Sequence, residues 1–379
     1  MQISLKWKTI IKIIPIYFYF ILLLLPIFAI EILNIQRPAM IIFYLLSLII
    51  TMPMHHAHEF KFSKTIIIAT SIILAIGLIE LAHLKINGLV YSIFCCLALL
   101  SGYMYPISPP KNPGINAYIT PIFLIVGVIF YKVNFEPTIT ILTSNYIGAV
   151  AFIICACWCV VFFRKINQKI FWTLTLIITG LTVTRSVFLG LAIGLILSYY
   201  SFTSKRKLFI TIIIVLTGVI FIAQYADDII DLYYAYNLFS LTNKNFETGR
   251  LDLWISILSP MKSMDFILGG VDLSNLSNES AAQGAKVSAH NGYISALVQS
   301  GILSMLLIIT LGMVLVKRTY NKNNQYSKIL TTIIIAYFFR EFFEVSIHAN
   351  NFPIISAFLF CVGLMINHIQ ILPLRAIQA

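Results

Sequence analysis

Residues 170–202 read IFWTLTLIITGLTVTRSVFLGLAIGLILSYYSF, a run of 33 residues whose only charge is Arg185. A helix needs about 20 apolar residues to cross a bilayer core about 30 Å thick, so this run is too long for one ordinary span. A charge at the bilayer centre costs about 2.5–3.5 kcal/mol on insertion scales, so one straight helix would be unfavourable. The stretch therefore predicts two membrane helices that meet in a turn at Arg185.

The rest of the chain follows the same pattern. Of its 379 residues, 59% are hydrophobic and 11% charged, whereas soluble domains carry about 25% charged residues. This composition excludes a nucleic-acid-binding domain, a secreted disulfide scaffold and a disordered tail. All six cysteines lie inside apolar runs, and we expect them to be small buried hydrophobic residues. We expect an all-α, polytopic integral membrane protein of about 12 transmembrane helices, at 10–30, 38–54, 65–82, 88–104, 117–131, 145–163, 170–183, 186–202, 208–224, 291–316, 328–346 and 352–372.

The placement of the basic residues predicts the orientation. With both termini in the cytoplasm, 17 Lys and Arg residues fall on the cytoplasmic side and 8 on the outer side, and Arg340 lies within a span. Cytoplasmic loops carry the excess of basic residues, so this count favours a multi-pass membrane protein with cytoplasmic termini. The net charge of +12 therefore indicates topology and no nucleic-acid partner.

One segment interrupts the apolar spans. Residues 225–290 carry eight acidic and four basic residues and alternate helix-like apolar spacing with Gly- and Ser-rich stretches. The chain thus divides into helices one to nine (1–224), a large, partly helical periplasmic loop (225–290) and helices ten to twelve (291–379). We expect the loop to cover the outer face of the membrane.

Ionisable side chains gather on this predicted outer side, and each allows a simpler interpretation. Arg185 could extend to lipid headgroups, Arg250 could be a solvated loop charge, and His290 with Asn291 could cap the tenth span. Arg340 and Glu344 are four residues apart and could form a structural ion pair on a helix. Taken together, several arginines and a histidine on one membrane face favour chemistry on a phosphate-bearing lipid. Arginine binds phosphate with two parallel hydrogen bonds, and histidine is a common general base.

Four short segments carry a resemblance to a known family. In order along the chain they are Thr184-Arg185-Ser186, Thr248-Gly249-Arg250-Leu251-Asp252-Leu253-Trp254, Leu268-Gly269-Gly270 and Ala289-His290-Asn291. This set resembles the O-antigen polymerase/ligase superfamily of bacterial inner membranes. The His-Asn pair is followed by nine residues and Gly301, as in the ligases, but Ser304 departs from the last position of that motif.

The resemblance implies a metal-independent glycosyltransferase that needs no cofactor. Its donor would be an undecaprenyl-diphosphate-linked oligosaccharide, bound at the periplasmic face, and a chain-length regulator is a candidate partner. The implied catalytic residues are His290, as the first candidate for the base, Glu344, as the second, and Arg185 and Arg250 on the diphosphate. The implied substrate-binding residues are Gly249, Gly269, Gly270, Asn291 and Arg340.

Three functions remain open at this point. The first is an O-antigen polymerase, which transfers the glycan onto the non-reducing-end sugar of another lipid-linked repeat unit. The second is an O-antigen ligase, which transfers it to lipid A core. The third is a flippase for lipid-linked oligosaccharides, although transporters usually place their functional charges at the membrane midplane between repeated halves.

Overall fold

The computed structural model describes residues 33–55, 63–83, 85–105, 254, 257–271, 291–321, 324–341 and 352–377, with isolated positions at 153, 177, 190–194 and 196. Every element within these ranges is an α-helix. The helices are α2 (Leu33–His55), α3 (Lys64–Ala82), α4 (Ile86–Met104), α13 (Ser263–Leu268), α14 (Gly292–Thr319), α15 (Gln325–Arg340) and α16 (Phe352–Ile377).

Helices α3 and α4 form an antiparallel pair with clear ends. The Ser63 hydroxyl accepts a hydrogen bond from the Thr65 amide at 3.3 Å and caps α3. Each helix has 19 residues and is therefore about 28 Å long, which matches a bilayer core. Within the described residues, α3, α4 and α14 are long and apolar enough to cross a membrane. An all-helical membrane protein is thus consistent with the structure.

Close backbone contacts join α4 to α16. A Cβ atom at Gly102 would collide with the carbonyl oxygen of Phe360, and one at Gly363 would collide with that of Leu99. Small residues let membrane helices approach this closely, so van der Waals packing can replace the hydrophobic effect between them. Phe360 also stacks at an edge against Phe43 of α2, with ring centroids 5.7 Å apart. Helices α2, α4 and α16 thus share one core.

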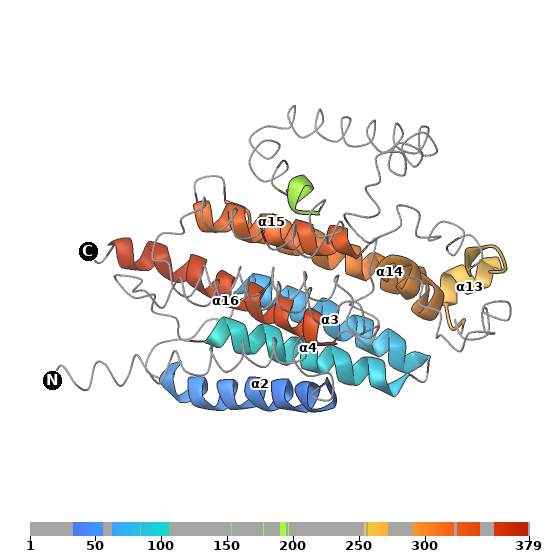
Figure 1. Ribbon diagram of the computed structural model, residues 1–379, viewed down its shortest axis with the longest axis horizontal. Coiled ribbons are helices and arrows are strands. Elements are labelled where there is room, and N and C mark those ends of the chain that lie inside the picture. The colour runs from blue at the N-terminus through green and yellow to red at the C-terminus, as the bar shows by residue number, and fades with distance from the viewer. Residues whose placement is uncertain are drawn as a thin grey trace.

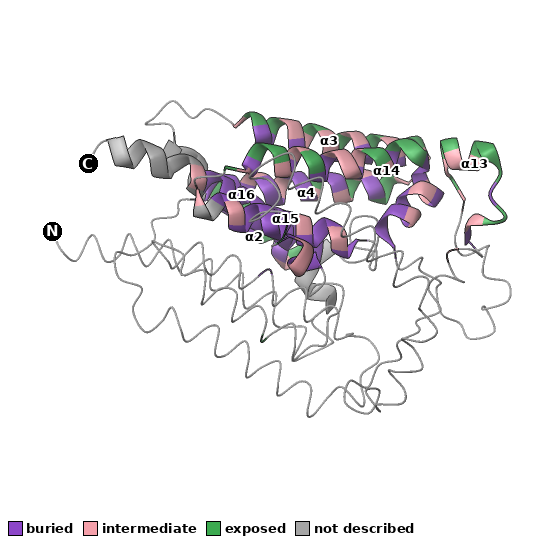
Figure 2. Ribbon diagram, turned by 90° about the horizontal axis from the view of Figure 1, so that it is seen from above, coloured by how far each residue is buried: buried purple, intermediate pink, exposed green. Residues whose placement is uncertain are grey.

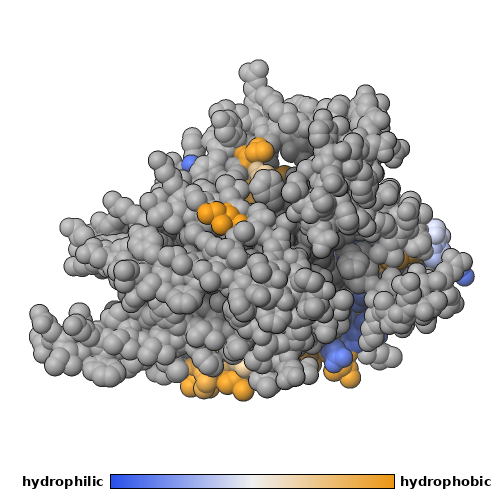
Figure 3. All heavy atoms as spheres, in the orientation of Figure 1, coloured by the Kyte–Doolittle hydropathy of each residue, from blue (hydrophilic) through white to orange (hydrophobic). Residues whose placement is uncertain are grey.

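The axes of the long helices run roughly alongside one another, and the helices are staggered along their length (Figure 1). At one end, the Tyr103 hydroxyl accepts a hydrogen bond from the Ser63 amide, and the Asn367 side chain donates to the Tyr105 carbonyl. At the other end, the Lys85 ammonium donates to the Gln299 carbonyl at 3.1 Å. Along the lower edge of the view, where α2 lies, Figure 3 shows hydrophobic side chains at the surface. Such exposed apolar faces suit helices that contact lipid.

The described helices overlap the predicted spans, but several ends differ: α2 begins five residues before the predicted span 38–54, and α16 ends five residues after the predicted span 352–372. The predicted span 291–316 is the helix α14, but it bends at Gly301, where φ is 79° and ψ is 176°. The predicted span 328–346 ends too late, because α15 finishes at Arg340 and Glu341 lies in a turn. Helix α13 lies inside the predicted loop. The predicted spans 10–30, 117–131, 145–163, 170–183, 186–202 and 208–224 lie wholly or largely outside the described residues.

Candidate functional site

Four of the nine candidate residues belong to the described part of the chain: Gly269, Gly270, Asn291 and Arg340. The other five lie outside the described residues: Arg185, Gly249, Arg250, His290 and Glu344. The site can therefore be built only from the helix ends that carry the first four. These helix ends form two groups. One group lies at the start of α14 and the other at its bend, nine residues later.

Asn291 is the N-cap of α14. Its side-chain oxygen accepts hydrogen bonds from the amides of Tyr293 and Ile294, both at 3.0 Å. These amides have no partner within the helix, so the cap satisfies two donors that would otherwise be orphaned. Asn291 is 3% exposed. Its two hydrogen bonds to backbone amides therefore show a capping role, which is one of the two interpretations of this residue from sequence.

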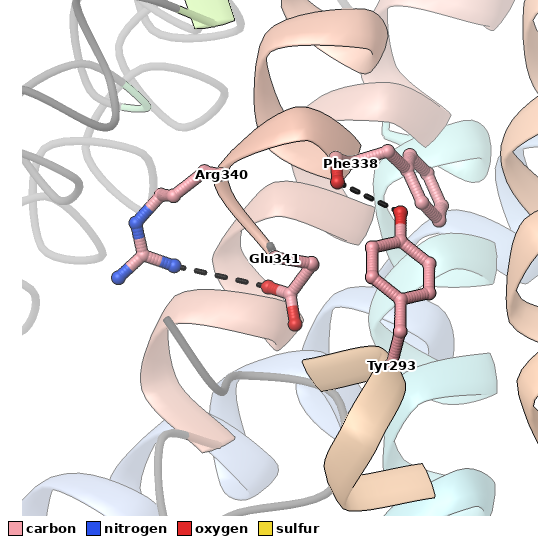
Figure 4. Close-up of polar contacts among 4 residues, drawn as sticks. All are labelled: Tyr293, Phe338, Arg340 and Glu341. Atoms are coloured by element: carbon pink, nitrogen blue, oxygen red, sulfur yellow. Dashed lines mark hydrogen bonds and ion pairs between the residues drawn. The ribbon is translucent and has the colours of Figure 1, made fainter. Parts of the chain in front are cut away.

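The start of α14 contacts the end of α15 directly. The Gly292 amide donates to the Glu341 carbonyl at 2.7 Å, and the Tyr293 hydroxyl donates to the Phe338 carbonyl at 2.8 Å. A Cβ atom at Gly292 would collide with Oε2 of Glu341, so the absence of a side chain there makes room for the carboxylate. We call this contact of residues 291–293 with residues 338–341 the α14–α15 junction (Figure 4).

A buried ion pair lies at the same junction. Nη1 of Arg340 is 3.8 Å from Oε1 of Glu341, and the two side chains are 3% and 0% exposed. Figure 4 shows the guanidinium and the carboxylate side by side where α15 ends. Charges are rarely buried unless they are paired or carry function, because desolvation costs several kcal/mol per ion. The junction thus combines a cationic group that can bind a phosphate with a carboxylate that can accept a proton.

Gly269 and Gly270 form the second group, at the bend of α14. Both have positive φ (73° and 85°), which L residues with side chains rarely adopt. The Gly270 and Val271 amides donate to the Gln299 and Val298 carbonyls at 3.1 and 3.2 Å. A Cβ atom at Gly301 would collide with the carbonyl oxygen of Ile267. The glycine pair is thus packed against α14, where the amides of Gly270 and Val271 bind helix carbonyls.

The bend exposes carbonyls that a straight helix would satisfy, and other elements bind them. Gln299 receives the Gly270 amide and also the Lys85 ammonium, which comes from the turn between α3 and α4. A cation at this position is favourable, because the first segment of α14 ends here with the negative end of its dipole. We call residues 267–270, residues 299–301 and Lys85 the Gly301 joint. It connects the predicted loop to the helices on both sides of it in sequence.

Two residues make contacts in these groups that the sequence does not predict: Glu341 at the junction and Lys85 at the joint. Glu341 is not among the candidate residues from sequence, because Glu344 has the helical spacing that pairs charges on one face. Lys85 is one of the eight basic residues predicted on the outer side, with no other role predicted for it. The signal available for Glu341 was its position at membrane depth beside an arginine. The contact between Lys85 and Gln299 spans 214 residues of sequence, and no local pattern predicts it.

The described residues hold no group of three or more His, Cys, Asp or Glu side chains arranged to bind a metal ion. No protein-family model matches the chain, and no curated protein is significantly similar to it in sequence. The α14–α15 junction and the Gly301 joint are therefore the features from which a function can be argued.

Proposed function

We propose that the protein is an O-antigen polymerase, a glycosyltransferase of the bacterial inner membrane. The observation that carries the proposal is the buried Arg340–Glu341 pair at the α14–α15 junction. It lies against Gly292, the second residue after His290, which is the first candidate for the base. Two sequence segments that are about 50 positions apart thus lie next to each other at one end of the bundle.

The reaction that suits these groups is a displacement at an anomeric carbon. A sugar hydroxyl of one lipid-linked repeat unit forms the new glycosidic bond as its proton passes to His290. The bond between the anomeric carbon of the donor glycan and the diphosphate oxygen breaks, and undecaprenyl diphosphate leaves with the electron pair. Arg185, Arg250 and Arg340 would stabilise the negative charge that develops on this leaving group.

The charges of the described helix ends support a periplasmic site. Lys64, Lys317, Arg318 and Lys328 lie at the end opposite the junction, with no acidic residue among the helix ends described there. At the junction end, both signs of charge occur, because the acidic residues Glu80, Asp265 and Glu341 lie there together with basic residues. Under the positive-inside rule this distribution favours a cytoplasmic location for the first end and a periplasmic one for the junction.

The test is complementation of a strain from which the gene has been deleted. Loss of a polymerase leaves the ligase intact, so we expect lipid A core to carry one repeat unit and no ladder of longer chains. The wild-type gene should restore the ladder and Arg340→Ala should not, at equal amounts of membrane protein. Arg318→Ala, at the opposite end of the bundle, is the matched control and should restore it. Lipopolysaccharide gels and an analysis of the lipid-linked pool give the result.

Two outcomes would overturn the proposal in different ways. Bare lipid A core together with long glycans on undecaprenyl diphosphate would identify a ligase instead. Repeat units trapped in the inner leaflet would identify a flippase. Full activity of Arg340→Ala would keep the enzyme class but remove the junction from the site.

A further inference from the structure

Helix α13 has two apolar faces, and only one of them is packed against protein. Phe266 faces α14 and joins a small cluster whose buried members are Ile257, Met261 and Val298. On the other side, Met264, Ile267 and Leu268 are 61%, 56% and 54% exposed. These three residues follow the i, i+3, i+4 spacing of a single helix face. A six-residue helix with three large apolar side chains on its outer face is unusual for a surface in contact with water.

The outer face of α13 lies next to exposed apolar side chains of helices that are long and apolar enough to span a membrane. Directly after the bend in α14, Ile302, Leu303 and Leu306 are exposed on a helix long and apolar enough to span a membrane. Leu78 of α3 and Ile86 of α4 are also exposed. Figure 2 shows the exposed faces of α3, α14 and α13 on the same side of the molecule.

The position of α13 along the bundle corresponds to the edge of the bilayer. Its last turn packs on Gly301, and from residue 302 to residue 319 α14 is about 27 Å long, close to one hydrocarbon thickness. At the same level lie the ends of α3 and α4, where the Lys85 ammonium bonds Gln299. Lysines are favoured at this depth, because their apolar stems lie in lipid and their charges reach water.

We propose that α13 is an interfacial helix that inserts Met264, Ile267 and Leu268 into the adjacent lipid leaflet. Its occupant is the phospholipid bilayer, because the apolar face is continuous with the exposed faces of helices long and apolar enough to span it. The polar side of the same helix, with the exposed Lys262 and the partly exposed Asp265, remains in the headgroup layer. Because the joint at Gly301 fixes α13 to α14, the predicted loop is held at the membrane surface at this point. This inference does not depend on the proposed glycosyl transfer.

The test is tryptophan fluorescence of the full chain in nanodiscs made of ordinary or brominated phosphatidylcholine, without any polyprenyl lipid. Ile267→Trp and Leu268→Trp place the probe on the exposed face. Lys262→Trp is the matched control, because Lys262 is exposed at the N-cap of the same helix and lies off that face. After subtraction of the wild-type signal from Trp7, Trp158, Trp172 and Trp254, the emission at 267 and 268 should be blue-shifted and quenched by bromine. Emission at 262 should be red-shifted and quenched mainly by iodide in the buffer.

Quenching at 267 and 268 by iodide to the same extent as at 262 would overturn the proposal, because the face would then be in water. Protection from both quenchers would also overturn it, and would indicate a protein surface such as a second copy of the chain. Bromine quenching that appears only after polyprenyl phosphate is added would assign the face to the substrate's tail and contradict the bilayer as its occupant. Two probe positions are used so that one poorly folded variant does not decide the result.

Discussion

The two segments of α14 form one continuous apolar run in the sequence, but they lie in different environments in the structure. In residues 292–300 no side chain is exposed, and polar groups such as Ser295 and Ser300 are buried among neighbouring elements. In residues 302–319, by contrast, exposed apolar residues alternate with a buried face at helical spacing. The first segment is therefore surrounded by protein, whereas the second presents apolar side chains on the outside of the bundle, as a helix in contact with lipid would. Hydropathy alone therefore does not distinguish a segment that belongs to the candidate site from one that is suited to span a membrane.

The largest effect on the first segment should come from Glu341→Gln. This change keeps the size of the side chain above Gly292 but removes the carboxylate charge that pairs with Arg340. Breaking a buried ion pair typically costs about 3–5 kcal/mol, so we expect a lower melting temperature of the purified protein. The double variant Arg340→Gln with Glu341→Gln should recover part of that loss, because no charge then remains to be buried.

The same pair of variants separates stability from activity. If Arg340 binds the diphosphate, the double variant should be more stable than Glu341→Gln and still inactive. A double variant as unstable as the sum of the two single changes would show that the pair contributes no coupling energy. The buried ion pair would then no longer distinguish the surroundings of the first segment from those of the second.

The boundary between the segments should respond next most strongly, through Gly301→Ala. Positive φ at a residue other than Gly costs about 1–3 kcal/mol, and here the new Cβ would also meet the Ile267 carbonyl, which is backbone and cannot rotate away. We expect reduced thermal stability and faster amide exchange at residues 267–271. Leu306→Ala, exposed on the second segment, is the control and should change stability by less than about 0.5 kcal/mol. Equal effects of the two changes would contradict the assignment of Gly301 as a joint.

The smallest of these effects should come from the cap. Asn291→Ala removes the acceptor for two amides and should cost about 1 kcal/mol of stability. Asn291→Asp keeps an acceptor there and should retain most of that stability, measured by the same melting experiment. If glycan assembly nevertheless fails with Asn291→Asp, the residue also contacts substrate. If both variants track stability alone, its role is limited to the cap.

The ends of the helices could be predicted where short-range chemistry determines them. Helix α3 was expected at 65–82 and is found at Lys64–Ala82, because an apolar run is bounded by a capping Ser63. The start of α14 was also predictable, because Asn is a strong N-cap residue. These features depend on a few neighbouring residues, and a single sequence contains them.

The bend at Gly301 and the end of α15 were not predictable in the same way. A glycine inside an apolar run is compatible with a straight helix, and only the contacts with residues 267–270 and Lys85 require the bend. Residues 341–346 continue the apolar pattern of α15, so periodicity carried the expected helix past Arg340. Of the candidate site, the sequence placed Arg340 and Asn291 at the same end of the bundle. The contact that joins them through Glu341 depends on tertiary packing.

The hydrogen bond from Lys85 to Gln299 has a consequence for the order in which the chain is assembled. The turn that carries Lys85 is synthesised more than 200 residues before Gln299, so α3 and α4 have left the ribosome when α14 emerges. The bent form of α14 needs donors for its free carbonyls, and in lipid an unsatisfied carbonyl costs several kcal/mol. We therefore expect α14 to enter the bilayer as a straight helix and to bend only after docking beside α3 and α4. Biogenesis of this protein would then end with a late conformational step. In that step the helical hairpin of α3 and α4, which is synthesised first, determines the final bent shape of α14.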